Sequence, residues 1–229
     1  ITPMFGEWVL MLDEVGVEGG YIVLENYITP EDLAPLIQGT VLDRYEFISE
    51  DPINLRECLL VQAHARKSVK PGAESSGTIP LDHHFNVRGI GTVILGAVVQ
   101  GGIRKHDTLK VYPGEESITV RSIQKHDDDF DWAVEGDRVG LALKNIDSDD
   151  LDRGFVLTDN PGIQSRKEIA VQADLVRYWS KPLTEGMVLH LGHWMQFIPT
   201  RIVAVDSDGD WRRPRLTLVL ERDLIYLQG

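Results

Sequence analysis

Two short stretches near the end of the chain place arginines beside aromatic residues. One runs from Trp211 to Arg215 and the other from Arg177 to Trp179, the latter on a predicted strand. Arginine binds phosphate through its forked guanidinium group, and Trp or Tyr can stack on an unpaired base. We therefore interpret six residues as candidates for RNA contact: Arg177, Trp179, Trp211, Arg212, Arg213 and Arg215. The alternative is that both tryptophans are half-buried and that the arginines neutralise nearby acids, namely Asp208, Asp210 and Glu221.

The residues that could bind a metal or carry out catalysis are poorly placed for either. His83 and His84 are adjacent, and His190 and His193 are three apart, so on strands each pair points to opposite faces. The acidic run 127–131 lacks the ligand spacing and the glycine of a calcium loop. A phosphate-binding loop and the common hydrolase motifs do not occur. We predict no metal site and assign no catalytic residue.

Composition and charge limit the function further. The 229 residues are 42% hydrophobic and 26% charged, as in a folded protein, with a net charge of −13. An acidic chain is a poor non-specific polyanion binder, so DNA is not an expected partner. Residues 164–229 nevertheless carry a net charge of +1, which leaves room for a local RNA surface. The longest charge-free stretches, 89–103 and 186–200, are too short to span a membrane, and one cysteine gives no disulfide framework. Without a signal-peptide pattern, we expect a cytoplasmic location.

The segment 1–70 mixes helices and strands. Apolar spacing predicts a helix over 4–15, and the apolar run 21–24 predicts a buried strand. Thr29-Pro30 begins a short helix that ends at Gly39, residues 45–48 alternate like a strand, and a third helix begins at 51–52. Such alternation is typical of an open α/β sheet. Two strands are too few to stand alone, so we interpret residues 1–72 as part of a larger domain.

After a Pro/Gly/Ser-rich linker at 70–77, the hydrophobic period changes to two. Short strands separated by turns every 8–12 residues predict an antiparallel barrel over 78–162. The turn signal 159–162 ends it, and residues 166–229 contain further predicted strands at 169–178, 187–191, 200–205 and 215–221. The predicted fold is mainly β, with two tandem antiparallel β-barrels preceded by a partial α/β segment.

Residues 79–96, from Ile79-Pro80-Leu81-Asp82-His83 through Gly91-Thr92-Val93, strongly resemble the opening of the second domain of translational GTPases of the elongation factor Tu type. The resemblance continues as far as Gly154, through the stretches 101–103, 107–114, 120–124, 136–143 and 152–154. It implies a β-barrel that contacts tRNA. Residues 164–229 resemble the third domain of the family only weakly.

The N-terminal segment resembles the last third of the family's nucleotide-binding domain. The family carries an Asn-Lys-x-Asp motif for guanine at the end of a strand, where this chain has Glu25-Asn26-Tyr27-Ile28. The lysine and the aspartate are both missing, so we interpret these four positions as a degenerate guanine motif. The resemblance places the phosphate loop upstream of Ile1. We expect no cofactor in this chain, and GTP with Mg²⁺ only if an upstream nucleotide domain is functional.

Asp82, His83 and Arg138 resemble the archaeal type of selenocysteine-specific elongation factor, in which an Asp-His pair and an arginine line the aminoacyl pocket. The resemblance implies a pocket for an aminoacyl group or tRNA formed by Asp82, His83, Phe85 and Arg138. Histidine and arginine would favour an anionic group by charge and hydrogen bonding. The alternative is that Arg138 pairs with Asp82 on the rim of the barrel.

Three hypotheses follow. The first is an elongation-factor-like module that binds tRNA or ribosomal RNA through its barrels without hydrolysing nucleotide. The second is a GTPase whose catalytic part lies outside this chain. The third is a protein-interaction scaffold derived from such a factor. We expect tRNA or the ribosome as the partner and no membrane. The cognate RNA, the involvement of selenocysteine and the oligomeric state stay open.

Overall fold

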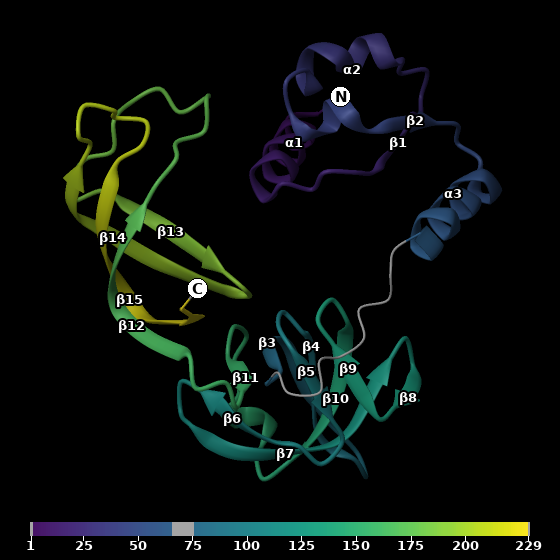
Figure 1. Ribbon diagram of the computed structural model, residues 1–229, viewed down its shortest axis with the longest axis vertical. Coiled ribbons are helices and arrows are strands. Elements are labelled where there is room, and N and C mark those ends of the chain that lie inside the picture. Colours follow the sequence, from purple (N-terminus) through teal and green to yellow (C-terminus); the bar gives the residue numbers. More distant parts are fainter. Residues whose placement is uncertain (1, 66–75, 229) are drawn as a thin grey trace. The chain divides into compact units, whose positions relative to one another are not determined.

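The computed structural model describes residues 2–65 and 76–228. The chain divides into two compact units, Ile1–Ser68 and Val69–Gly229. The second unit contains both a barrel and a C-terminal sheet (Figure 1). Most of the predicted linker at 70–77 lies outside the described residues, and the division into three domains stays a prediction.

The first unit has the predicted order of helices and strands. Its elements are α1 (Pro3–Val15), β1 (Tyr21–Val23), α2 (Pro30–Ile37), the 3₁₀ turn η1 (Val41–Arg44), β2 (Glu46–Ile48) and α3 (Pro52–Ala65). The two strands pair in parallel, with Tyr21 opposite Glu46. Thr29 caps α2 with Pro30 in the first turn, as its sequence predicts.

A small core holds this unit together. Val9 of α1, Ile37 of α2 and Leu42 of η1 are buried against one another. The side chain of Asp13 accepts a hydrogen bond of 2.8 Å from the backbone N–H of Val41, which joins α1 to η1. The ring of Tyr45 lies directly against Gly20, where a β-carbon would overlap it, so a larger residue there would have to displace the ring.

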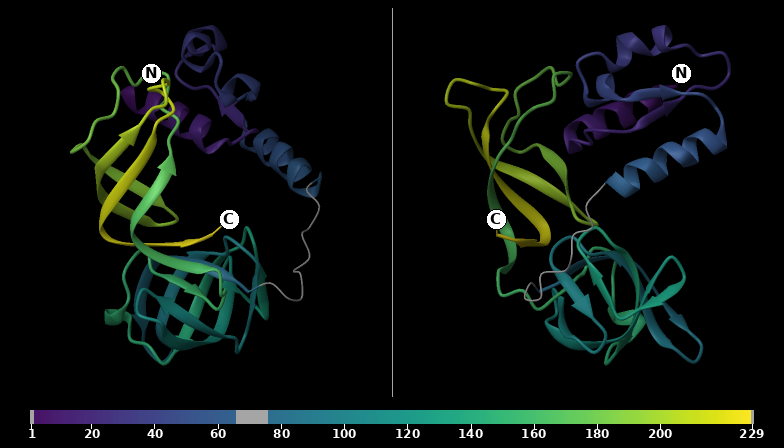
Figure 2. Two further views of the ribbon diagram at one scale, coloured as in Figure 1. Left: turned by 60° about the vertical axis from the view of Figure 1, so that its left-hand side comes forward. Right: turned by 45° about the vertical axis from the view of Figure 1, so that its right-hand side comes forward.

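Residues 78–158 form a closed antiparallel barrel (Figures 1 and 2). Six strands close the ring in the order β10-β4-β3-β11-β6-β7, and β7 pairs back with β10. Their bounds are β3 (Thr78–Val87), β4 (Gly91–Ala97), β6 (Thr108–Tyr112), β7 (Glu116–Lys125), β10 (Arg138–Lys144) and β11 (Val156–Thr158). Three short strands and one 3₁₀ turn lie outside the six-stranded ring. They are β5 (Gly102–Arg104), β8 (Asp128–Phe130), β9 (Trp132–Val134) and η2 (Ser148–Asp150).

The barrel interior is filled by the apolar residues whose period of two predicted the strands. Ile79, Ile94, Ile118, Ile123 and Leu141 are all fully buried. Outward positions on the same strands are polar or half-exposed, as alternation requires. The barrel prediction is therefore confirmed.

The C-terminal region forms a four-stranded antiparallel sheet in the order β12-β15-β14-β13. The strands are β12 (Ile163–Gln172), β13 (Val188–His193), β14 (Gln196–Asp206) and β15 (Arg215–Leu227). Residues 207–214 connect β14 to β15. The mainly β fold class is thus confirmed.

One strand prediction in this region is wrong. We predicted a strand over 169–178 that carries Arg177, but β12 ends at Gln172. Residues 173–176 leave the sheet, and Arg177 and Tyr178 lie in a turn in which the N–H of Trp179 bonds to the carbonyl of Val176 at 2.9 Å. The apolar residues Ala173 and Leu175 of this loop pack on the sheet core, which explains the strand-like pattern.

The barrel and the sheet meet at Gly154. Its φ is +90°, and a β-carbon there would lie 3.0 Å from the carbonyl oxygen of Met195, in the turn between β13 and β14. Arg153 contacts the sulfur of the same methionine at 3.8 Å. A side chain at position 154 would therefore disturb both the local backbone and this contact.

None of the helices in residues 2–65 and 76–228 has the length and apolar character needed to cross a bilayer.

Candidate functional site

Asp82 occupies an irregular position in β3. Leu81 pairs with Gly96 and His83 with Leu95, so Asp82 is one extra residue relative to β4. Such a bulge bends the strand and redirects the neighbouring side chains. Gly96 makes the close approach possible, because a β-carbon there would lie 2.6 Å from the carbonyl oxygen of Pro80. The local sequence thus positions Asp82 and His83 at the edge of the barrel.

The Asp82 carboxylate is shared by three basic side chains. Nε of Arg153 donates a hydrogen bond of 3.0 Å to one oxygen. Nδ1 of His83 lies 3.3 Å from the other oxygen, and a terminal nitrogen of Arg138 lies 3.9 Å from it. The carboxylate is mostly buried, whereas the Arg138 side chain is 78% exposed. Two guanidinium groups therefore share one carboxylate, and the exposed Arg138 is the more weakly held of the two.

Three of the residues proposed from sequence for the aminoacyl pocket therefore meet: Asp82, His83 and Arg138. Arg153 was missed, although the stretch 152–154 contributed to the resemblance. The pairing of β11 with β3 brings it next to Asp82 across 71 positions of sequence. Phe85 lies further along β3 opposite Val93, with 42% of its surface exposed.

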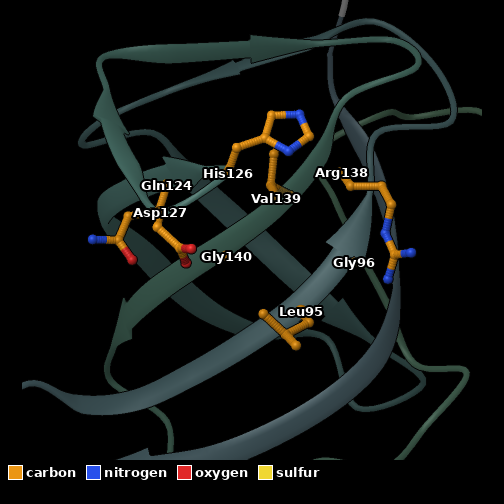
Figure 3. A pocket seen from close by; sticks show the side chains of 8 residues that line it. All are labelled: Leu95, Gly96, Gln124, His126, Asp127, Arg138, Val139 and Gly140. Atoms are coloured by element: carbon orange, nitrogen blue, oxygen red, sulfur yellow. The ribbon is translucent and has the colours of Figure 1, made fainter. Parts of the chain in front are cut away.

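A shallow pocket of about 190 Å³ opens beside Arg138 (Figure 3). It is lined by residues of β4, of β10 and of the hairpin between β7 and β8, namely Leu95, Gly96, Gln124, His126, Asp127, Arg138, Val139 and Gly140. Leu95 supplies an apolar wall, while Arg138, His126 and Asp127 supply charge or hydrogen bonds. A site of this size and composition fits one small polar or anionic side chain. Asp82, His83 and Phe85 are not among its lining residues.

The two arginine–aromatic stretches lie side by side in the structure. The N–H of Leu175 donates to the carbonyl of Arg212 at 2.8 Å, and that of Ala173 to the carbonyl of Pro214 at 2.9 Å. The Arg212 guanidinium in turn reaches the carbonyls of Val176 and Arg177 at 3.4 and 3.5 Å. Segments 173–179 and 210–214 thus form one surface, which we call the arginine–aromatic surface. Arg215 begins β15 next to it.

The side chains of this surface are partly engaged with one another. Arg212 lies over the ring of Trp211, with 4.6 Å from the guanidinium carbon to the ring centre, and Arg177 lies over Tyr178 at 4.7 Å. Arg213 pairs with Asp174 at 3.3 Å, an acid that the alternative interpretation did not include. Trp211 is half-buried, while Tyr178 and Trp179 are exposed. Exposed aromatic rings beside guanidinium groups can take both the base and the phosphate of an unpaired nucleotide.

The predicted degenerate guanine motif forms a tight turn directly after β1. Asn26 and Tyr27 have φ values of 56° and 63°, and the N–H of Ile28 bonds to the carbonyl of Glu25 at 3.2 Å. The Tyr27 side chain is fully exposed. Among the described residues, no group of three or more His, Cys, Asp or Glu side chains converges as metal ligands would.

Comparison with known proteins adds to this geometry. A family model, Elongation factor Tu domain 2, matches residues 91–158. The uncharacterized protein MJ0325 of Methanocaldococcus jannaschii is 35% identical over 229 residues, which are 100% of this chain and 70% of that protein. The chain belongs to the elongation factor Tu family.

Within the elongation factor Tu family, the chain is similar to selenocysteine-specific factors. That of M. jannaschii is 28% identical over 136 residues, which are 59% of this chain and 29% of that protein. The crystal structure of SelB from Methanococcus maripaludis in its apo form has a TM-score of 0.82 at 24% identity, over 100% of this chain and 55% of that one. The crystal structure of a bacterial selenocysteine-specific elongation factor has a TM-score of 0.73 at 21% identity. The match covers 99% of this chain and 39% of that one. The structures establish a shared fold, and the chain spans only part of each of these proteins.

Proposed function

We propose that this chain is the RNA-binding part of an elongation-factor-like protein. It holds aminoacyl-tRNA or ribosomal RNA through its β regions and does not hydrolyse nucleotide itself. The observation that carries the proposal is the cluster at the edge of the barrel, where Arg138 and Arg153 share the single carboxylate of Asp82. Such an excess of guanidinium groups beside a small pocket suits an anionic ligand.

The arginine–aromatic surface supplies the second part of the proposal. It would bind the RNA backbone and unpaired bases, whereas the pocket beside Arg138 would take the aminoacyl group. The similarity to selenocysteine-specific elongation factors supports this class of ligand. The two regions would then contribute differently: the surface contributes affinity that depends on salt, and the pocket contributes discrimination between attached amino acids.

Filter binding of bulk tRNA at several salt concentrations tests the surface. Each phosphate contact contributes roughly 0.7 to 0.9 to the slope of log affinity against log salt. Replacing Arg212, Arg213 and Arg215 together by glutamine should therefore flatten the slope by about two to three units. A matched control removes three exposed arginines elsewhere, Arg44, Arg56 and Arg88, and should change the slope much less. Equal slopes for the parent and the first triple variant would show that this surface is wrong.

The pocket is tested by the same assay with aminoacylated tRNA. Replacing Asp82, His83 or Arg138 should leave the salt slope for bulk tRNA nearly unchanged and reduce only discrimination by the attached amino acid. If neither the parent nor any variant binds tRNA or ribosomal subunits, the scaffold hypothesis replaces this proposal.

Nucleotide binding separates the proposal from the GTPase hypothesis. With Glu25-Asn26-Tyr27-Ile28 in place of the guanine motif, this chain should show no measurable affinity for GTP or GDP in calorimetry. Loss of the guanine-binding carboxylate leaves polar groups of the base without partners, which costs several kcal/mol even when a phosphate loop is present. The same titration on the longest natural form of the protein is the stricter test, and micromolar affinity with preference over ATP would favour the GTPase.

A further inference from the structure

The turn that joins β7 to β8 has an unusual sequence for its geometry. Lys125 pairs with Asp128, so His126 and Asp127 form a two-residue turn, with φ values of 53° and 68°. Turns with both central residues in the left-handed region strongly favour Asn-Gly or Asp-Gly, because a side chain is strained there. A histidine kept in such a position at the wall of a pocket points to a role other than forming the turn.

Contacts below the turn fix its position relative to Arg138. Nζ of Lys125 is 3.0 Å from a carboxylate oxygen of Asp137, the residue before Arg138. The same ammonium group lies over the rings of Phe130 and Trp132, 4.2 and 4.7 Å from their centres, and it is mostly buried. The ion pair therefore ties the base of the hairpin to the start of β10.

His126 and Arg138 consequently line the same pocket. Figure 3 shows the imidazole ring of His126 beside Val139, with Arg138 leaving the same strand one residue earlier. Among the described residues no side-chain hydrogen bond of His126 is formed, so both ring nitrogens remain available to a ligand. Gln124, on the other hand, already donates its amide hydrogen to Asp129 at 3.1 Å.

We propose that His126 is a further specificity-determining residue of this pocket, where it donates a hydrogen bond to a small anionic side chain of the aminoacyl group bound beside Arg138. This rests on the proposed function of the site. Leu95 covers the apolar part of such a side chain, Arg138 supplies the positive charge, and His126 supplies a second donor from the turn between β7 and β8. The carboxylate of Asp127 disfavours ligands whose negative charge extends beyond those two donors.

A first experiment addresses the pocket without RNA. N-acetyl-aspartate methyl ester and its asparagine counterpart serve as probes, titrated at millimolar concentration into the full chain. The imidazole C–H signals of His126 are assigned by their loss in His126→Asn. They should shift with the aspartate probe and much less with the asparagine probe. Asn tolerates the left-handed conformation, so His126→Asn removes the ring while keeping the turn. Absence of any shift would overturn the assignment of His126.

A second experiment uses one tRNA charged with either Asp or Asn. The parent should prefer the Asp form, and His126→Asn should reduce this preference about tenfold, as expected for a lost hydrogen bond to a charged group. His106→Asn, which changes an exposed histidine with a φ of 72° in another turn that does not line the pocket, should not reduce it. Equal preference in the parent and His126→Asn overturns the inference, even if both bind tRNA. Shifts with the free probe but no tRNA binding would instead refute the proposed function alone.

Discussion

The barrel and the C-terminal sheet bury their apolar faces in different ways. In the barrel the sheet closes on itself, so each ring strand has two neighbours and the interior is sealed. The C-terminal sheet has four strands, and β12 and β13 form its edges in the described part of the chain. Its core is completed by the loop residues Leu175, Leu183 and Met187.

This difference also appears in the residues that each region exposes. Ring-strand core residues such as Ile94 and Leu141 are fully buried. The sheet exposes Val188, Phe197 and Val203 on one face, where Phe197 stacks on His190 with 4.9 Å between ring centres. A closed ring therefore depends little on its connections, whereas an open sheet depends on loops that can move away from it.

The largest expected effect is a loss of stability when a core residue of the barrel is truncated. Ile94→Ala removes a fully buried side chain from a sealed interior that cannot collapse around the cavity, so we expect a loss of about 2–5 kcal/mol in the free energy of unfolding. Leu183→Ala, in the loop that covers the sheet, should cost less because the loop can relax. Urea unfolding followed by the amide signals of each region measures both. A larger loss for Leu183→Ala would contradict the comparison.

The contact between the two regions gives the next prediction. Gly154→Ala places a side chain in the left-handed region and against Met195. Gly136 has nearly the same φ, +92°, but its β-carbon would meet open space. Gly136→Ala therefore measures backbone strain alone, of about 1–2 kcal/mol, and Gly154→Ala should exceed it. Thermal unfolding of the two variants gives the difference, and equal melting temperatures would show that the junction adapts without cost.

The smallest expected effect is a pH dependence of stability in the C-terminal sheet that the barrel does not share. His193 ends β13, and its Nε2 is buried with no hydrogen-bond partner among the described residues. Burial lowers the pKa of His193 below its ordinary value of 6.5. The unfolded chain therefore binds a proton that the folded sheet resists, so stability falls as the pH drops below about 6.5 and is constant above it. His193→Gln should flatten this dependence for the sheet and leave the barrel unchanged. Urea midpoints between pH 5 and 7.5 test it, and an unaltered profile would exclude His193 as the cause.

Sequence reasoning succeeded where local pattern decides structure. The barrel strands follow from a period of two, and α2 follows from its Thr29-Pro30 start, because these signals act over short stretches of chain. It failed at 173–178, where the alternating pattern is that of a strand. There the side chain of Arg212 bonds to the carbonyls of Val176 and Arg177, and a partner so distant in sequence leaves no local signal.

In the candidate site too, contacts between residues distant in sequence could not be predicted. The family resemblance predicted that three residues share a pocket, namely Asp82, His83 and Arg138. Their spacing in the sequence did not imply that they meet. Arg153 forms the shortest contact with Asp82, yet only the pairing of β11 with β3 reveals it. His126 was not singled out, since a histidine next to an acidic run carries no signal until the structure shows it in the same pocket as Arg138.

The pairing of β11 with β3 has a consequence for how the protein is made. The barrel's first strand and its last strand are joined by a buried hydrogen bond of 3.0 Å between the hydroxyl groups of Thr78 and Thr158. β3 therefore keeps an open edge until residue 158 has left the ribosome, and any chain truncated before Val156 leaves β3 and β6 without the strand that joins them. Closure across such a long stretch of sequence comes late in folding. The nascent barrel thus spends most of its synthesis as an open sheet that needs protection from aggregation, and its short last strand, Val156–Thr158, converts it into a ring.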